Sequence, residues 1–362
     1  MILIKQIKVY CPEYIGVKDI LIGGKEILMI DDNINISGKD IKIINGKNKN
    51  AVPGFMDGHV HITGGGGENS FRSRAPEIKA TSLIEGGITT VVGLLGTDST
   101  TRSMENLVAK AKALKEEGLT AYALTGSYEY PTATLIGSIK KDIVFIDEII
   151  GAKIAISDHR DSAVSANELA RLASDARIGG MLSGKAGILE VHLGHGKKSI
   201  DIIWQVLEEN DIPIGTIRPT HVSKNRELLK ECLRFAKKGG YIDATCNSRN
   251  ISNYNIIMEA IESQVPLDRI TFSSDGNGSW SKYDEDGRIT KIGLASTKTM
   301  YEGFRDMISN GLSIEESLPY YTSNVSRALY MYPRKGCLSI GSDADILIID
   351  NDYNIDTVVA LG

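Results

Sequence analysis

The chain has 362 residues, of which 42% are hydrophobic and 24% charged, which suits a globular protein with a large core. Its formal net charge of −5 comes with no basic cluster, so we expect no nucleic-acid partner. Apolar runs stay well below the roughly 20 residues of a membrane span, and lysines interrupt the N-terminal segment where a signal peptide would be apolar. We therefore predict a cytoplasmic protein without membrane association. The four cysteines show no CxxC spacing, which favours buried thiols over a zinc knuckle or a disulfide framework.

Residues 2–50 alternate short β-rich runs with Gly, Asn and Asp turns, a pattern typical of antiparallel strands. From residue 51 onward, strand-like segments alternate with amphipathic helical ones. The strand candidates in this region number eight, at residues 55–62, 89–95, 120–126, 152–157, 187–193, 214–222, 241–246 and 269–275. Eight β-then-α units predict a (β/α)8 barrel, in which catalytic side chains lie at the C-terminal ends of the strands.

Two of the predicted helices carry clear end signals. At residues 165–180, Ser165 and Glu168 form a capping-box pattern, and Gly179 is expected to be the left-handed residue that ends the helix. At residues 225–240, Asn225 is the expected N-cap and Gly239 follows the helix. Both patterns place helices between consecutive barrel strands.

The C-terminal region first continues the helical pattern, in residues 296–311 and 313–331, and then returns to β texture in residues 335–361. Strand-rich sequence at both ends of a barrel suggests that the two termini pair. We predict a small β-sandwich built from residues 1–53 and 335–362, with the barrel spanning residues 54–334.

Four of the six histidines fall at the ends of predicted strands. His59 and His61 form an HxH pair, whose side chains share one face of a strand because side chains alternate with period two. His192, His221 and then Asp275 follow at the ends of later strands. Buried imidazoles at strand ends are ready ligands for transition metals. This order of residues predicts a metal-dependent hydrolase site.

The motifs around these residues resemble the amidohydrolase superfamily. The resemblance rests on PGFMDGHVHI, PTHV, SSDG and the GxxADILIID run near the C-terminus. Within the superfamily, HITGGGGE, VVGLLGTDS, TGSYEYP, AKIAISDHRD, KAGILEVHLG and SSDGNGS resemble the isoaspartyl dipeptidase family of metallopeptidases. The similarity covers nearly the whole chain and implies hydrolysis of β-aspartyl dipeptides, small-molecule substrates.

The resemblance implies two Zn2+ ions and names their ligands. Neutral imidazoles alone would leave excess positive charge, so a negative bridge is needed, and Lys153 matches the family lysine that is carboxylated to supply it. By the same resemblance His59 and His61 bind one metal with Asp275, while His192 and His221 bind the other. A metal-bridging hydroxide would attack the amide, with Asp275 as general acid and base. Tyr128 resembles the family tyrosine that stabilises the oxyanion.

The resemblance also names the substrate contacts. Glu68 is expected to pair with the free α-amine of the aspartyl residue, and Gly66 and Gly67 let backbone N–H groups approach an anion. Arg160 suits bidentate capture of a carboxylate. Lys224 stands where the family usually has a second arginine, which keeps the charge and loses the planar fork. The remaining expected contacts are Thr97, Tyr128 and Ser279. A homo-oligomer, such as an octamer, is implied as well.

Two other functions remain open at this point. Cyclic-amide hydrolases of the dihydroorotase and hydantoinase type use the same metal ligands, although their substrates lack a free amine for Glu68 to bind. Dihydropyrimidinase-like assembly proteins have lost metal ligands, whereas all six ligand positions are present here. The family also tends to continue beyond the position of Gly362, which suggests either a smaller β-sandwich or a missing stretch.

Overall fold

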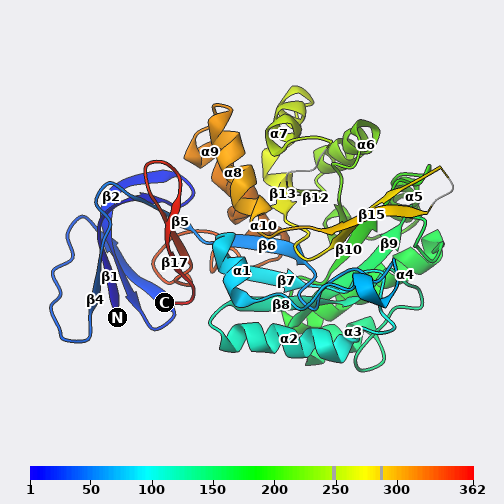
Figure 1. The fold of residues 1–362 in the computed structure, drawn as a ribbon, viewed down its shortest axis with the longest axis horizontal. Coiled ribbons are helices and arrows are strands. Elements are labelled where there is room, and N and C mark those ends of the chain that lie inside the picture. The colour runs from blue at the N-terminus through cyan, green and yellow to red at the C-terminus, as the bar shows by residue number, and fades with distance from the viewer. Residues whose placement is uncertain (247–249, 286–287) are drawn as a thin grey trace.

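The computed structural model describes residues 1–246, 250–285 and 288–362. A barrel of alternating strands and helices makes up most of the molecule, and a separate sheet lies at one side, where both chain ends are found (Figure 1). Within the described ranges, no helix combines the length and the apolar character needed to cross a membrane.

The barrel sheet has eight parallel strands, and each hydrogen-bonds to the next in chain order. They are β6 (Phe55–Val60), β7 (Ile88–Gly93), β8 (Thr120–Gly126), β9 (Ile149–Ile156), β10 (Ile188–Leu193), β11 (Ile217–Thr220), β12 (Ile242–Thr245) and β13 (Ile270–Ser273). A bridge between Val60 and Gly276 brings the first and last strands together. β9 and β10 are buried along their whole length, which explains their mostly apolar sequence. The predicted barrel and its eight strands are confirmed.

Helices follow the strands and cover the outside of the barrel (Figure 1). They are α1 (Ala80–Glu85), α2 (Met104–Glu116), α3 (Ile139–Phe145), α4 (Ala166–Ser183), α5 (Asp201–Glu209), α6 (Arg226–Lys237), α7 (Asn253–Glu262), α8 (Thr299–Ser309), α9 (Ile314–Ser317) and α10 (Ser323–Ala328). The predicted helical stretch at 313–331 is divided, because a 3-10 turn that contains Pro319 separates α9 from α10.

The predicted helix ends are mostly confirmed. Ser165 and Glu168 form the capping box of α4, and the side chain of Asn225 caps α6. The prediction for Gly179 is wrong, because α4 continues to Ser183 and ends at Gly184, which has the left-handed conformation. A Cβ atom at Gly179 would lie 3.0 Å from the Cβ of Ile143 in α3, so this glycine serves close helix packing instead of helix termination.

The second sheet joins the two ends of the chain. It contains β1 (Ile2–Tyr10), β2 (Tyr14–Gly23), β3 (Glu26–Asp31), β4 (Lys42–Asn45), β5 (Asn50–Pro53), β16 (Ile346–Ile349) and β17 (Ile355–Val359). β5 pairs in parallel with β1 and antiparallel with β16, so N- and C-terminal strands share one hydrogen-bonded sheet. Side chains from both segments, including Ile4, Ile20, Ile346 and Ile348, are fully buried in its core. The predicted pairing of the termini is confirmed, while the boundaries at residues 53 and 334 stay predictions.

Asp19 of β2 connects its strand with β1 and with the loop that follows β3. Its buried carboxylate accepts hydrogen bonds from the backbone N–H groups of Gln6 and Ile34, at 2.8 and 2.9 Å, and lies 2.5 Å from Lys5 Nζ. Burial alone would raise the pKa of Asp19, but the hydrogen bonds and the lysine outweigh it, so the net pKa is lowered.

A β-hairpin that the sequence patterns did not indicate follows the last barrel strand. It consists of β14 (Ser279–Tyr283) and β15 (Ile289–Leu294), which pair antiparallel. The hairpin begins four residues after Asp275 and brings Ser279 and Trp280 to the pocket described next.

Candidate active site

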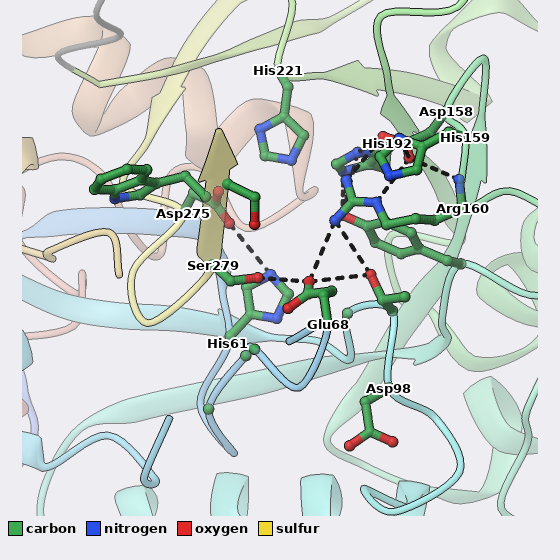
Figure 2. A pocket seen from close by; sticks show the side chains of 18 of the residues that line it. His61, Glu68, Asp98, Asp158, His159, Arg160, His192, His221, Asp275 and Ser279 are labelled. Atoms are coloured by element: carbon green, nitrogen blue, oxygen red, sulfur yellow. Dashed lines mark hydrogen bonds and ion pairs between the residues drawn. The ribbon is translucent and has the colours of Figure 1, made fainter. Parts of the chain in front are cut away.

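A pocket opens at the C-terminal ends of the barrel strands and collects most of the predicted site residues (Figure 2). The predicted residues that line it are His61, Gly66, Glu68, Thr97, Tyr128, Arg160, His192, His221, Lys224, Asp275 and Ser279. Gly67 is not among the described lining residues. His59 and Lys153 are completely buried. The barrel therefore brings together residues from 61 to 279 of the chain.

Strand ends place the metal-ligand candidates. His59 lies near the end of β6 and His61 follows it, His192 lies near the end of β10, and His221 directly follows β11. His221 and Asp275 have φ angles of 63° and 54°, in the left-handed region that non-glycine residues seldom adopt. Such backbone conformations persist only where the surroundings hold them, and they cluster at functional sites.

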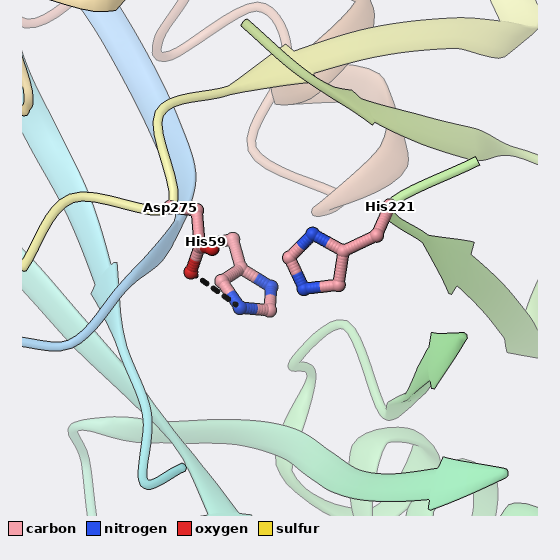
Figure 3. Close-up of side chains that lie close together, drawn as sticks. All are labelled: His59, His221 and Asp275. Atoms are coloured by element: carbon pink, nitrogen blue, oxygen red, sulfur yellow. Dashed lines mark ion pairs between the residues drawn. The ribbon is translucent and has the colours of Figure 1, made fainter. Parts of the chain in front are cut away.

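The predicted ligands converge. Asp275 Oδ1 lies 3.3 Å from His61 Nε2 and 3.6 Å from His59 Nε2. The ring centroid of His221 is 4.7 Å from that of His59 and 4.5 Å from that of His192. Figure 3 shows His59, His221 and Asp275, whose potential ligand atoms all lie within 4.8 Å of one another. Lys153 Nζ is 3.4 Å from His59 Nε2, so the lysine belongs to the same cluster.

Burial controls the charge of this cluster. It lowers the pKa values of His59, His192 and His221 well below the usual histidine value, so these rings are neutral and keep a lone pair. It also lowers the pKa of Lys153 to about 8. Burial opposes ionisation of Asp275, but the adjacent imidazoles reverse this effect and lower its pKa below the usual range.

The cluster fits a divalent metal centre. Asp275 Oδ1 is buried and has no hydrogen-bond partner among the described residues, although a buried carboxylate oxygen is costly to leave unpaired. Neutral imidazole nitrogens and a carboxylate oxygen are the ligand set that Zn2+ prefers. The donor atoms present therefore suit zinc chemistry.

Below the histidines lies a buried polar network that the sequence reasoning missed. Glu190 Oε1 lies 2.6 Å from His59 Nδ1, and Glu190 Oε2 accepts a 2.8 Å hydrogen bond from Arg218. Arg218 also donates to Asp243, at 2.7 Å. Carboxylate partners of this kind fix the orientation and tautomer of a metal-binding histidine. Alternation in β10 could have indicated Glu190, because it lies two residues before His192 and faces the same barrel interior.

Glu68 has one anchored oxygen and one unpaired oxygen. Its Oε1 accepts a 2.7 Å hydrogen bond from Ser279 Oγ and lies 3.4 Å from Arg160 Nη1 and 3.5 Å from Thr97 Oγ1. Its Oε2 is buried and has no partner among the described residues. An ammonium group in the pocket could satisfy this oxygen.

Arg160 is held by a residue that was not predicted as part of the site. Asp158 accepts from Arg160 Nε at 2.8 Å and from Nη2 at 2.9 Å, so this edge of the guanidinium group is already occupied. The Nη1 group remains, at 3.4 Å from Thr97 Oγ1. Asp158 Oδ2 also lies 3.1 Å from His192 Nε2, so the same carboxylate positions Arg160 and a candidate metal ligand. Capture of a substrate carboxylate by Arg160 stays a prediction.

Tyr128 and Lys224 both lie beside His192. The Tyr128 hydroxyl is 2.8 Å from His192 Nδ1, and burial raises the pKa of the phenol well above its usual value, which keeps the proton on the oxygen. Lys224 Nζ is 3.2 Å from His192 Nε2 and donates to the carbonyl oxygen of Leu193. Burial lowers the pKa of Lys224 to about 8. Both side chains therefore lie in the pocket, as predicted.

Comparison with known proteins identifies the family. The sequence profile of the amidohydrolase family matches residues 50–362. The chain belongs to the amidohydrolase family. A solved structure of a beta-aspartyl dipeptidase from Fervidobacterium islandicum AW-1, in complex with beta-Asp-Leu dipeptide, is 42% identical to this amidohydrolase. The similarity covers 100% of this chain and 95% of that one, with a TM-score of 0.94.

More distant relatives carry other names. A dihydroorotase from Staphylococcus epidermidis is 34% identical over 107 residues. This match covers 30% of the present chain and only 24% of the dihydroorotase. A dihydroorotase from Elusimicrobium minutum is 23% identical over 378 residues, covering 92% of this chain and 84% of its own. The dihydropyrimidinase structure from Brevibacillus agri, with 15% identity and a TM-score of 0.67, shares the fold.

Proposed function

We propose that this amidohydrolase is a binuclear, metal-dependent dipeptidase that hydrolyses the β-aspartyl bond of dipeptides. The unpaired, buried Oε2 atom of Glu68 carries this proposal. A β-aspartyl substrate has a free α-ammonium group that would pair with this oxygen, whereas a cyclic amide would leave it without a partner at an energetic cost. The 42% identity to a beta-aspartyl dipeptidase solved with beta-Asp-Leu supports the same substrate class.

The metal centre in this proposal uses the converging side chains. His59 and His61 would hold one divalent ion with Asp275, and His192 and His221 would hold the other, while a carboxylated Lys153 would link them. Zinc matches these donors. Bound there, the ions would lower the pKa of water toward about 7 and polarise the scissile carbonyl.

The side chains of this chain would carry out the remaining steps. The carboxylate of Asp275 accepts the proton of the attacking water and returns it to the nitrogen of the leaving amino acid. The protonated Tyr128 hydroxyl donates a hydrogen bond to the carbonyl oxygen as negative charge develops there. The Nη1 group of Arg160 and the ammonium group of Lys224 attract the carboxylates of the substrate, and Glu68 binds the amine.

The deciding experiment compares three substrates with the metal-loaded enzyme and measures bound metal on the same preparation. We expect turnover of β-Asp-Leu, little or none of α-Asp-Leu and dihydroorotate, and about two zinc ions per chain. Efficient opening of dihydroorotate would establish the cyclic-amide function instead, and cleavage of only the α-linked peptide would contradict the proposal. Absence of both metal and activity would favour an assembly protein. The homo-oligomer stays a prediction.

A further inference from the structure

Arg102 is a buried cation beside the glycine-rich loop that carries Glu68. It lies in the segment between β7 and α2, and only 6% of the residue is exposed. Its guanidinium group donates hydrogen bonds to the carbonyl oxygens of Thr63, of Gly65 at 2.9 Å and of Ala75 at 3.0 Å. Three backbone carbonyls from two passes of the chain therefore meet at one side chain.

The direction of these carbonyls determines where the loop presents its N–H groups. In a trans peptide the C=O and N–H bonds point in opposite directions. Because the carbonyl of Gly65 points to Arg102, the N–H group of Gly66 points away from it, and Gly66 and Arg102 both line the pocket. The N–H groups of Gly66 and Gly67 have no acceptor among the described residues.

The loop can adopt this shape only with glycine. Gly66 and Gly67 have φ angles of 78° and 110°, and a Cβ atom on Gly66 would lie 2.3 Å from the carbonyl oxygen of Ser73. Consecutive N–H groups in such turns form anion-binding sites. A conformation this unusual needs outside support. The hydrogen bonds from Arg102 to the carbonyls of Thr63 and Gly65 supply part of it, beside the backbone bonds from Ala75 N–H to Gly65 O and from Gly65 N–H to Asn277 O, both at 2.9 Å.

We propose that Arg102 is a positioning residue for the carboxylate subsite of the substrate. By holding the carbonyls of the loop, it leaves the Gly66 N–H group free for the α-carboxylate of the aspartyl residue. This inference rests on the proposed function and deepens it, since the α-carboxylate and the α-amine are attached to the same carbon. Their receptors must therefore be neighbours, and Glu68 lies two residues beyond Gly66.

Arginine suits this role better than lysine. Its planar fork reaches several acceptors in fixed directions, whereas an ammonium group presents its donors from one point. Arg102→Lys therefore keeps the charge and loses the geometry. Arg74→Gln is the matched control. Arg74 and Arg102 each lie 3.9 Å from a carboxylate oxygen of Asp98, and Arg74 also contacts Thr101, but it donates to none of the loop carbonyls that Arg102 holds.

The test compares β-Asp-Leu with β-alanyl-leucine, which keeps the amine and the scissile bond and lacks the α-carboxylate. We expect Arg102→Lys to lower kcat/KM for β-Asp-Leu at least about tenfold, mainly through KM, and to change that for β-alanyl-leucine by less than about threefold. The ratio of the two values does not depend on how much of the variant folds. Where β-alanyl-leucine is not turned over, its inhibition constant is compared with the KM of β-Asp-Leu, because neither value depends on the folded fraction. Arg74→Gln should leave the ratio unchanged.

Two results would overturn the inference. Equal losses on both substrates would give Arg102 a purely structural role, and a wild-type enzyme that handles both substrates equally would have no carboxylate subsite. If the wild type does not cleave β-Asp-Leu, the proposed function fails, and calorimetric binding of L-aspartate against β-alanine then tests Arg102. A preference for aspartate that Arg102→Lys weakens would support the positioning role, and a preference that is absent or unaffected would refute it.

Discussion

Replacement of Glu68 by glutamine tests the amine receptor with little change in shape. In the wild type, Ser279 holds Oε1 at 2.7 Å, and Oε2 is buried and unpaired, so the substrate ammonium has one well-placed acceptor. The side chain is 11% exposed, so solvent screens the pair only in part. A hydrogen bond to a charged partner contributes about 1.5–3 kcal/mol. Since about 1.4 kcal/mol corresponds to tenfold, kcat/KM for β-Asp-Leu should fall about 10- to 150-fold.

The assay includes succinyl-leucine, which keeps the α-carboxylate position and lacks the amine. The variant should process this compound, or bind it where turnover is absent, within about threefold of the wild type, because the lost interaction is not made there. Glu77→Gln is a matched control, since Glu77 is 47% exposed, accepts a hydrogen bond from Asn106 and is not among the pocket-lining residues. Equal losses on both compounds, or an unchanged rate on β-Asp-Leu, would refute the assignment of Glu68 to the amine.

Three further predictions concern the metal centre and the terminal sheet. Lys153→Ala should lose bound metal and activity, and acetate or propionate should restore part of both by replacing the bridging carboxylate; full metal content without added acid would contradict this. Asp275→Asn should lower kcat at least about a hundredfold and change KM only a few-fold, and a near-normal kcat would remove Asp275 from proton transfer. Asp19→Asn should destabilise the protein by about 1–3 kcal/mol at pH 7 in urea unfolding. The pKa of Asp19 is lowered in the folded state, so this stabilisation is complete above the ordinary pKa near 4 and disappears as the pH falls through the lowered value. If the wild type and the variant differed in unfolding free energy by the same amount at pH 3 and pH 7, this prediction would be wrong.

The sequence by itself determined the architecture and the chemistry of the metal-ligand candidates. Period-two alternation placed His59 and His61 on one face, and the repeated strand and helix pattern predicted the barrel. The cap formed by Ser165 and Glu168 was also readable, because it depends on residues three apart. These features are local, or they follow from a fold in which strand ends always meet at the same face.

Only the tertiary structure decided which side chains from separate loops contact one another. Asp158 occupies the fork of Arg160, and Arg102 holds the carbonyl of Gly65, contacts that depend on how separate loops pack. Gly179 carried a helix-ending signal, yet α4 continues through it because α3 packs closely against it. Local preferences amount to about 1 kcal/mol, and burial of a tightly packed interface exceeds that. Long-range packing therefore overrides such signals, and the order of residues along the chain does not reveal where it will do so.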